Sequence, residues 1–174
     1  MPSNKENNFG LLEFKKVLNY NSKIGKFIRR IPINQFKVGG IAGSINNKGY
    51  IKIKVCGKNV AASHLAWLYA YGGWPSKQID HINGDKADNR ICNLREATNL
   101  ENCRNRGNLK SNISGYKGVG FRTRAGMYEV RASFGGKRVY LGSFKTVEEG
   151  AAAYSKFASA NYGEFLHSSL KIKE

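Results

Sequence analysis

The chain has 174 residues, with 29 Lys and Arg against 12 Asp and Glu, which gives a formal net charge of +17 at pH 7. This length accommodates one domain or two small ones, and a hydrophobic fraction of 41% excludes a chain that is disordered throughout. No apolar run approaches the ~18 residues of a membrane span, and the N-terminal MPSNKENNFG lacks the apolar stretch of a secretory signal. We therefore expect an intracellular, cytoplasmic protein with no membrane partner. The excess of basic residues predicts a polyanionic partner, most often nucleic acid.

The first part of the chain alternates short helical and extended patterns. Apolar residues at helical spacing predict a short helix over 11–18, and residues 26–31 favour a strand. The Gly- and Asn-rich segment 39–49 is typical of a loop with turns. Residues 50–55 alternate apolar side chains with Lys, which predicts a half-buried strand with a basic outer face, and residues 56–63 return as a hairpin.

The central part combines an apolar helix with a polar block. Residues 64–71 are apolar nearly all round and predict a buried helix. A short strand is expected at 78–82, followed by a turn at 83–85 and a second extended piece at 93–95. A further helix is expected to begin near Thr98, because a Glu follows three residues later in the capping-box pattern.

The last part of the chain follows another pattern. Residues 107–115 are polar and contain two Gly, and we interpret them as a linker. Three β-type runs follow at 118–124, 127–134 and 138–144, separated by hairpin signals. A second capping box predicts a helix that begins after Thr146. We therefore expect an α+β fold that ends in a small three-stranded antiparallel sheet packed on one helix.

The acidic residues are more informative than the basic ones. All three Asp of the chain, Asp80, Asp85 and Asp88, lie within nine positions. A basic protein that only coats phosphate gains nothing from this clustering, whereas a metal site or a tight polar loop does.

Four polar side chains are expected to meet around this loop: Asp80 and His81 at the strand end, Asn93 across the loop, and Asn102 in the helix. Carboxylate and amide oxygens suit Mg²⁺ or Mn²⁺, and a neutral imidazole with a reference pKa of ~6.5 is a workable base. A base, an orienting amide and a single metal are the parts needed for phosphodiester hydrolysis. The alternative is that the D-H pair followed by N-G-D forms a polar turn and nothing more.

The stretch IDHINGDKADNRICNLREATNLENCRNR closely resembles the HNH nuclease motif, the ββα-metal fold, in its phage and intron-encoded homing branch. Together with the segments before it, the resemblance spans residues 37–106. It implies that His81 is the general base and that Asn93 orients it. Asp80 and Asn102 would then hold one Mg²⁺ or Mn²⁺ ion.

Other positions of this stretch receive different expectations. Many relatives carry His where this chain has Asn102, and the difference favours Mg²⁺ or Mn²⁺ over a zinc-like site. His64, which opens the apolar helix, is assigned no catalytic role. The residues expected to hold the turn are Asn83, Gly84, Asp85, Asp88 and Asn89.

The middle β-run of the last part, MYEVRASF, places alternate side chains on opposite faces. One face is apolar and is expected to pack on the helix. The other carries Arg131, joined by Arg122, Arg124, Arg138 and Tyr140 of the neighbouring strands. A sheet that shows Arg and Tyr to solvent fits the DNA major groove, and the alternative is an ordinary solvated basic face.

Residues 116–174 resemble the Apetala/ethylene-response-factor type of DNA-binding domain, on the pieces YKGV, YLGSF and TVEEGAAAY. Gly120 stands where plant members have Arg, and Arg124 and Tyr140 stand where they have Trp, so the plant target sequence does not carry over. The positions that the resemblance assigns to DNA contact are Lys117, Arg122, Arg124, Arg131, Arg138 and Tyr140.

These resemblances divide the chain into an N-terminal extension (1–36), an HNH nuclease domain (37–106), a linker (107–115) and a DNA-binding domain (116–174). Both parts are basic, because residues 1–106 carry a formal charge of +11 and residues 107–174 carry +6. The DNA partner is therefore expected to contact both.

The expected function is a site-specific, metal-dependent DNA endonuclease of homing type that nicks one strand of double-stranded DNA per active site. The first alternative is a sequence-specific DNA-binding regulator with an inactive nuclease half, and the second is a non-specific RNA-binding protein. No heptad or evident interface is present, so we expect a monomer without an obligate protein partner. The resemblance implies a phage-infected or bacterial host cell.

Overall fold

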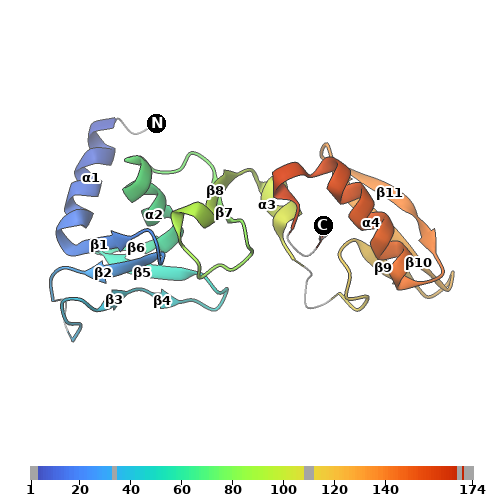
Figure 1. The fold of residues 1–174 in the computed structure, drawn as a ribbon, viewed down its shortest axis with the longest axis horizontal. Coiled ribbons are helices and arrows are strands. Elements are labelled where there is room, and N and C mark those ends of the chain that lie inside the picture. The colour runs from blue at the N-terminus through green and yellow to red at the C-terminus, as the bar shows by residue number, and fades with distance from the viewer. Residues whose placement is uncertain (1–3, 33–34, 108–111, 168–169, 171–174) are drawn as a thin grey trace. The chain divides into compact units, whose positions relative to one another are not determined.

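The computed structural model describes residues 4–32, 35–107, 112–167 and 170, and only the backbone of residues 4–9. Helices and small antiparallel sheets alternate along the chain, so the α+β class expected from the sequence is confirmed (Figure 1). The chain forms two compact units, residues 1–98 and residues 99–174. The domain ranges expected from the sequence stay a prediction. None of the described helices is long and apolar enough to cross a membrane.

The first unit contains three small antiparallel sheets, of order β1-β2-β3, β4-β5-β6 and β7-β8. Its elements are α1 (Asn4–Val17), β1 (Leu18–Asn21), β2 (Lys26–Arg29), β3 (Ile41–Ala42), β4 (Ser44–Ile45), β5 (Ile51–Val55), β6 (Lys58–Ala61), α2 (Ala62–Tyr71), β7 (Gln78–His81), the 3₁₀ turn η1 (Ile91–Asn93) and β8 (Leu94–Ala97).

Two features of this unit differ from the sequence prediction. Segment 39–49 was expected to be a loop, but it contains the two-residue strands β3 and β4, which are too short to leave a periodic signal. Gly43 separates them at φ 105°, and a Cβ there would lie 2.8 Å from the Ile51 side chain. The first helix is also longer than predicted, and β1 follows it directly.

A single apolar core holds the first unit together. Phe27 of β2, Ile53 of β5 and Leu65 and Leu68 of α2 are fully buried, and each such side chain stabilises the fold by about 1.5–3 kcal/mol. Ile79, next to the polar end of β7, belongs to the same core. The core therefore fixes the strand that carries the candidate site.

The second unit is a three-stranded antiparallel sheet of order β11-β10-β9 with α4 packed on one face (Figure 1). Val130 and Ala132 of β10 pack against Tyr154 and Ala158 of α4, as the alternation predicted. The capping box at Thr146 is present. The elements are α3 (Asn99–Asn105), β9 (Val119–Arg122), β10 (Met127–Phe134), β11 (Lys137–Phe144), α4 (Val147–Asn161) and the 3₁₀ turn η2 (Gly163–Phe165).

Candidate active site

The β7–β8 pair presents two neighbouring polar residues where a strand ends. The register places Asp80 opposite Arg95, and His81 is the last residue of β7. The chain turns directly afterwards, and the Gly84 N–H donates to the His81 carbonyl at 2.9 Å. Asp80 and His81 are each only 4% exposed. The two side chains predicted to carry the chemistry are therefore adjacent and buried.

Arg95 holds the Asp80 carboxylate in place. Its Nε and Nη2 donate to the same oxygen, Oδ2, at 2.9 and 2.8 Å. The side chains of Arg95 and Asp80 are only 12% and 5% exposed. Because a buried charge needs a partner, Arg95 both balances the charge of the carboxylate and fixes its orientation.

Asn89 holds the His81 ring. Its Nδ2 donates to the Ala87 carbonyl at 3.0 Å, which turns the amide so that Oδ1 faces His81 Nε2 at 3.3 Å. A carbonyl oxygen only accepts, so the neutral ring donates from Nε2 and Nδ1 is its accepting nitrogen. Burial lowers the pKa of His81, although the hydrogen bond to Asn89 and the Asp80 charge oppose this shift. Neutral imidazole is the form that accepts a proton.

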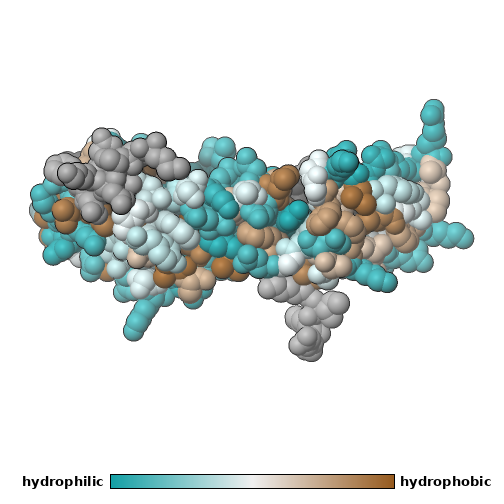
Figure 2. Space-filling view, turned by 90° about the horizontal axis from the view of Figure 1, so that it is seen from above, coloured by the Kyte–Doolittle hydropathy of each residue, from teal (hydrophilic) through white to brown (hydrophobic). Residues whose placement is uncertain are grey.

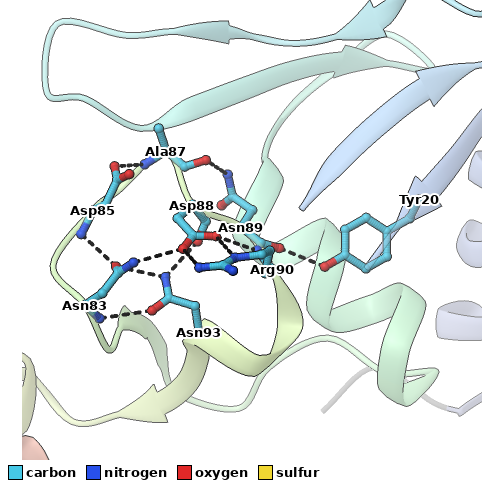
Figure 3. Close-up of polar contacts among 8 residues, drawn as sticks. All are labelled: Tyr20, Asn83, Asp85, Ala87, Asp88, Asn89, Arg90 and Asn93. Atoms are coloured by element: carbon cyan, nitrogen blue, oxygen red, sulfur yellow. Dashed lines mark hydrogen bonds and ion pairs between the residues drawn. The ribbon is translucent and has the colours of Figure 1, made fainter. Parts of the chain in front are cut away.

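A set of side-chain hydrogen bonds braces the loop between His81 and β8 (Figure 3). Asn83 donates from Nδ2 to Asp88 at 2.9 Å and accepts from the Asp85 N–H at 2.9 Å. Arg90 donates to both oxygens of Asp88, at 2.8 and 2.7 Å, and this contact lowers the pKa of Asp88 to about 2. Asn83, Asp85 and Asp88 thus have the structural role expected of them.

Asn93 lies in the middle of this loop. Its Oδ1 accepts from the Asn83 N–H at 3.0 Å, and its Nδ2 donates to Asn83 Oδ1 at 3.0 Å and to the Asp88 carbonyl at 2.9 Å. The sequence placed Asn93 against the His81 ring, whereas the structure shows these loop bonds for Asn93 and a ring contact for Asn89. A catalytic role for Asn93 stays a prediction.

The expected metal ligands fall on both units. Asp80 lies in β7, and Asn102 lies in α3 of the second unit, so their pairing stays a prediction. The described residues contain no group of three or more His, Cys, Asp or Glu that forms a metal cage. Mg²⁺ needs only one or two carboxylates, since waters and substrate phosphates complete its shell. The buried Asp80 carboxylate, oriented by Arg95, fits an ion of this kind.

Basic side chains adjoin His81 on the side of β5. The Tyr50 ring centre lies 5.9 Å from that of His81, and Lys86 Nζ lies 4.9 Å from the Tyr50 ring centre. Lys52 is an exposed residue of β5, two positions after Tyr50. Burial lowers the pKa of His64, at the start of α2, and the nearby Lys52 charge lowers it further.

Lys117, expected to contact DNA, is half-buried and caps a helix instead of projecting freely. Its Nζ donates to three carbonyls at the end of α3, those of Cys103, Arg104 and Arg106, at 3.1, 2.6 and 2.6 Å. The last carbonyls of a helix lack partners within it and attract a cation. Lys117 thus stabilises α3 against the first residues of the sheet.

Glu129 stands among the basic residues on the outer face of β10. Its carboxylate accepts hydrogen bonds from both Arg122 and Arg131. These two arginines, Arg122 foremost, lower the pKa of Glu129. One acidic residue therefore aligns two of the cations that were expected to contact DNA.

The other predicted DNA contacts are exposed. Arg124 and Arg138 make no ion pair within the described part of the chain. The Tyr140 hydroxyl lies 2.8 Å from Ser143 Oγ on the same strand. A hollow of about 640 Å³ lies beside this face, and Arg104, Arg122, Arg131 and Arg138 are among its lining residues.

Three residues of the site escaped prediction or received another role. Arg95 was not predicted, although the strand register could have indicated it, because pairing of the two strands across the loop places Arg95 opposite Asp80. Asn89 was assigned to the turn, and its side chain in addition holds His81. Tyr20, which donates to the Asn89 carbonyl, leaves no signal in the sequence because 69 positions separate the two residues.

A family model described as HNH endonuclease matches residues 60–104, about a quarter of the chain. The match runs from β6 into α3 and includes Asp80, His81, Asn93 and Asn102. No curated protein and no solved structure matches the chain. The match supports a nuclease, a hydrolase that acts on DNA, in agreement with the resemblance of this stretch to the HNH motif.

Proposed function

We propose that the chain is a site-specific, metal-dependent endonuclease of homing type that hydrolyses a phosphodiester bond in double-stranded DNA and nicks one strand per active site. The observation that carries the proposal is the buried Asp80–His81 pair, whose ring is held by Asn89, within the stretch that matches HNH endonuclease. The ββα-metal arrangement of β7, β8 and α3 is part of the proposal.

His81 acts as the general base. The neutral ring takes a proton from a water molecule, whose oxygen forms a bond to the scissile phosphorus while the bond from phosphorus to the 3′ oxygen breaks. The departing 3′ oxygen takes a proton from solvent. Asn89 keeps the ring in one orientation throughout, because its oxygen accepts from Nε2.

Asp80 and Asn102 are the residues that would hold Mg²⁺ or Mn²⁺. When bound, a divalent ion supplies positive charge next to the phosphate and the leaving oxygen. Arg95 contributes by keeping the Asp80 carboxylate in a single orientation, as hydrogen-bonded partners do for metal-ligating carboxylates generally.

The cations beside His81 supply contacts to the DNA backbone. Lys52 and Lys86 are exposed and make no ion pair with an acidic residue in the described part of the chain. Hydrophilic residues cover much of the face shown in Figure 2. When Lys52 and Lys86 neutralise phosphates of the DNA, they release the counterions of those phosphates, and the resulting affinity falls as the salt concentration rises.

The second unit reads the DNA. Its outer sheet face presents Arg122 and Arg131, aligned by Glu129, and the exposed Arg124, Arg138 and Tyr140. Arg side chains make bidentate contacts to guanine in the major groove. This reading rests on the resemblance to the Apetala/ethylene-response-factor type and on the Arg-rich face.

The test uses supercoiled plasmids that carry a library of DNA inserts, incubated with the full chain and Mg²⁺ or Mn²⁺. We expect the wild type to convert plasmids with the target to the nicked form, and His81→Ala to lower the rate at least about 100-fold. His167→Ala, which removes a histidine of the second unit, serves as the control. Sequence-specific binding without nicking would establish the regulator, and equal affinity for structured RNA and duplex DNA would establish the RNA-binding alternative.

A further inference from the structure

We infer that the N-terminal hairpin β1–β2 is a working part of the nuclease site, with Tyr20 as a positioning residue that holds Asn89 and, through it, the His81 ring. The inference rests on the proposed function. It gives a role to a segment that lies outside residues 60–104, the stretch matched by the HNH endonuclease model.

The contact that carries the inference joins β1 to the loop after β7. The Tyr20 hydroxyl donates to the backbone carbonyl of Asn89 at 2.7 Å, and Figure 3 shows the tyrosine reaching the loop from its own strand. Asn89 is thereby held at three points, through its carbonyl by Tyr20, through Nδ2 by Ala87, and through Oδ1 by His81. Of these three contacts, the one from Tyr20 ties Asn89 to the N-terminal hairpin.

The turn of the same hairpin lies directly against the loop. Gly25 has φ 67°, and a Cβ built on it would lie 2.4 Å from the Arg90 nitrogen and 2.6 Å from the Asn89 carbonyl carbon. No side chain fits at that distance. The hairpin and the loop therefore pack backbone to backbone, which only glycine permits at this position.

The tyrosine is itself held firmly. Its ring stacks on Phe27 at 4.8 Å and meets Tyr69 of α2 edge-on at 6.2 Å. Burial raises the pKa of Tyr20 to about 12, so the hydroxyl keeps its proton and remains a donor at neutral pH. The hairpin and α2 thus form one aromatic cluster, and the Tyr20 hydroxyl at its edge contacts Asn89, the residue that orients His81.

A base must be held close to its productive geometry, since a displacement of about 1 Å lowers the rate about 100-fold. The segment 82–90 contains no helix or strand, so its shape depends on side-chain bonds of this kind. Loss of the Tyr20 hydroxyl leaves Asn89 less constrained. The rate of the chemical step should therefore fall, while the contacts to the DNA backbone remain.

The experiment compares Tyr20→Phe with Tyr69→Phe. Tyr69 is the matched control, because it belongs to the same aromatic cluster and its hydroxyl donates to the Leu18 carbonyl at 3.2 Å, away from the loop. We expect Tyr20→Phe to lower kcat about tenfold, the size of effect that supporting residues typically have, with KM for DNA unchanged. Tyr69→Phe should keep the wild-type kcat, and thermal melting of both variants checks that neither effect is a loss of folding.

Amide hydrogen exchange provides a readout that needs no cleavage. In Tyr20→Phe, faster exchange should be confined to residues 82–93, whereas Tyr69→Phe should leave these amides unchanged. The inference is overturned if Tyr20→Phe cuts at the wild-type rate, or if both variants lose activity and protection equally. A wild-type chain that does not cut would refute the proposed function. The exchange data alone would then show whether Tyr20 holds the loop through Asn89.

Discussion

Asp80 and Arg95 lie opposite each other in the β7–β8 pair, and the guanidinium of Arg95 donates twice to one oxygen of the Asp80 carboxylate. A fixed positive charge therefore stands behind the carboxylate proposed to hold the divalent ion. The side chains of the pair are only 12% and 5% exposed, so loss of one partner leaves the other charge largely buried. The orientation of Asp80 consequently depends on a residue outside the four that the motif assigns to the chemistry.

Replacement of Arg95 should destabilise the first unit strongly. Arg95→Ala leaves the buried Asp80 without its arginine partner, which costs about 3 kcal/mol of unfolding free energy. Arg90→Ala is the control, since Arg90 pairs with Asp88 at 46% exposure and exposed pairs contribute at most about 1 kcal/mol. Urea unfolding of both variants measures the difference, and equal losses would show that burial of the Asp80 pair does not matter.

The lysines beside His81 should contribute to DNA affinity through phosphate contacts. Lys52→Gln and Lys86→Gln are each expected to weaken binding to all DNA sequences alike and to reduce the slope of log K against log salt by about 1. Binding titrations between low and physiological salt provide the measurement. Lys16→Gln removes the same charge from α1, where Lys16 pairs with Glu13, and should leave the slope unchanged. If the Lys52 and Lys86 variants keep the wild-type salt slope, as Lys16→Gln should, these two lysines do not contact DNA.

The sequence predicted those parts of the fold that carry long, regular patterns. The apolar helix α2, the alternating strand β5 and the capped helix α4 all leave a periodic signal, and each is present. The strands β1, β3 and β4 span two to four residues. A two-residue strand such as β3 or β4 holds only one repeat of the alternating pattern, and β1 continues directly from α1, so neither case leaves a strand signal that stands out in the sequence.

The part of the candidate site that lies within one short stretch of sequence could be predicted. Adjacent Asp80 and His81 follow from one short motif, and their burial at a strand end agrees with it. Which amide touches the His81 ring depends on the path of the loop, and here Asn89 takes that contact while Asn93 ties the loop together. The brace from Tyr20 depends on tertiary packing alone.

Acid should weaken the loop through Asp88. Hydrogen bonds from Arg90 hold the pKa of Asp88 at about 2 in the folded chain, below the ~3.9 of an unfolded Asp. A depressed carboxyl pKa means that the unfolded chain binds more protons, so this stabilisation is complete above pH ~4 and is lost as the pH falls through the folded value. The unfolding free energies of wild type and Asp88→Asn, measured with urea, should therefore approach each other as the pH falls from 4 to 2. A difference that stays constant over this range would contradict the assignment.

Lys117 should act on the stability of the second unit and not on DNA affinity. Its ammonium group satisfies three carbonyls at the end of α3, and hydrogen bonds to a charged group contribute about 1.5–3 kcal/mol. Lys117→Gln should therefore lower the unfolding free energy by about 2 kcal/mol while the salt slope of DNA binding stays at the wild-type value.

Arg138→Gln is the matched variant for this prediction, because Arg138 lies in β11 of the same unit, is exposed and makes no ion pair among the described residues. It should reduce the salt slope by about 1 and leave the unfolding free energy within about 0.5 kcal/mol of wild type. Parallel salt titrations and urea unfolding of the two variants separate the roles. If the salt slope of DNA binding falls equally in both variants, Lys117 contacts the DNA, as the resemblance to the plant domains implies. Its ammonium group would then leave the carbonyls of α3 and bind a phosphate when the DNA binds.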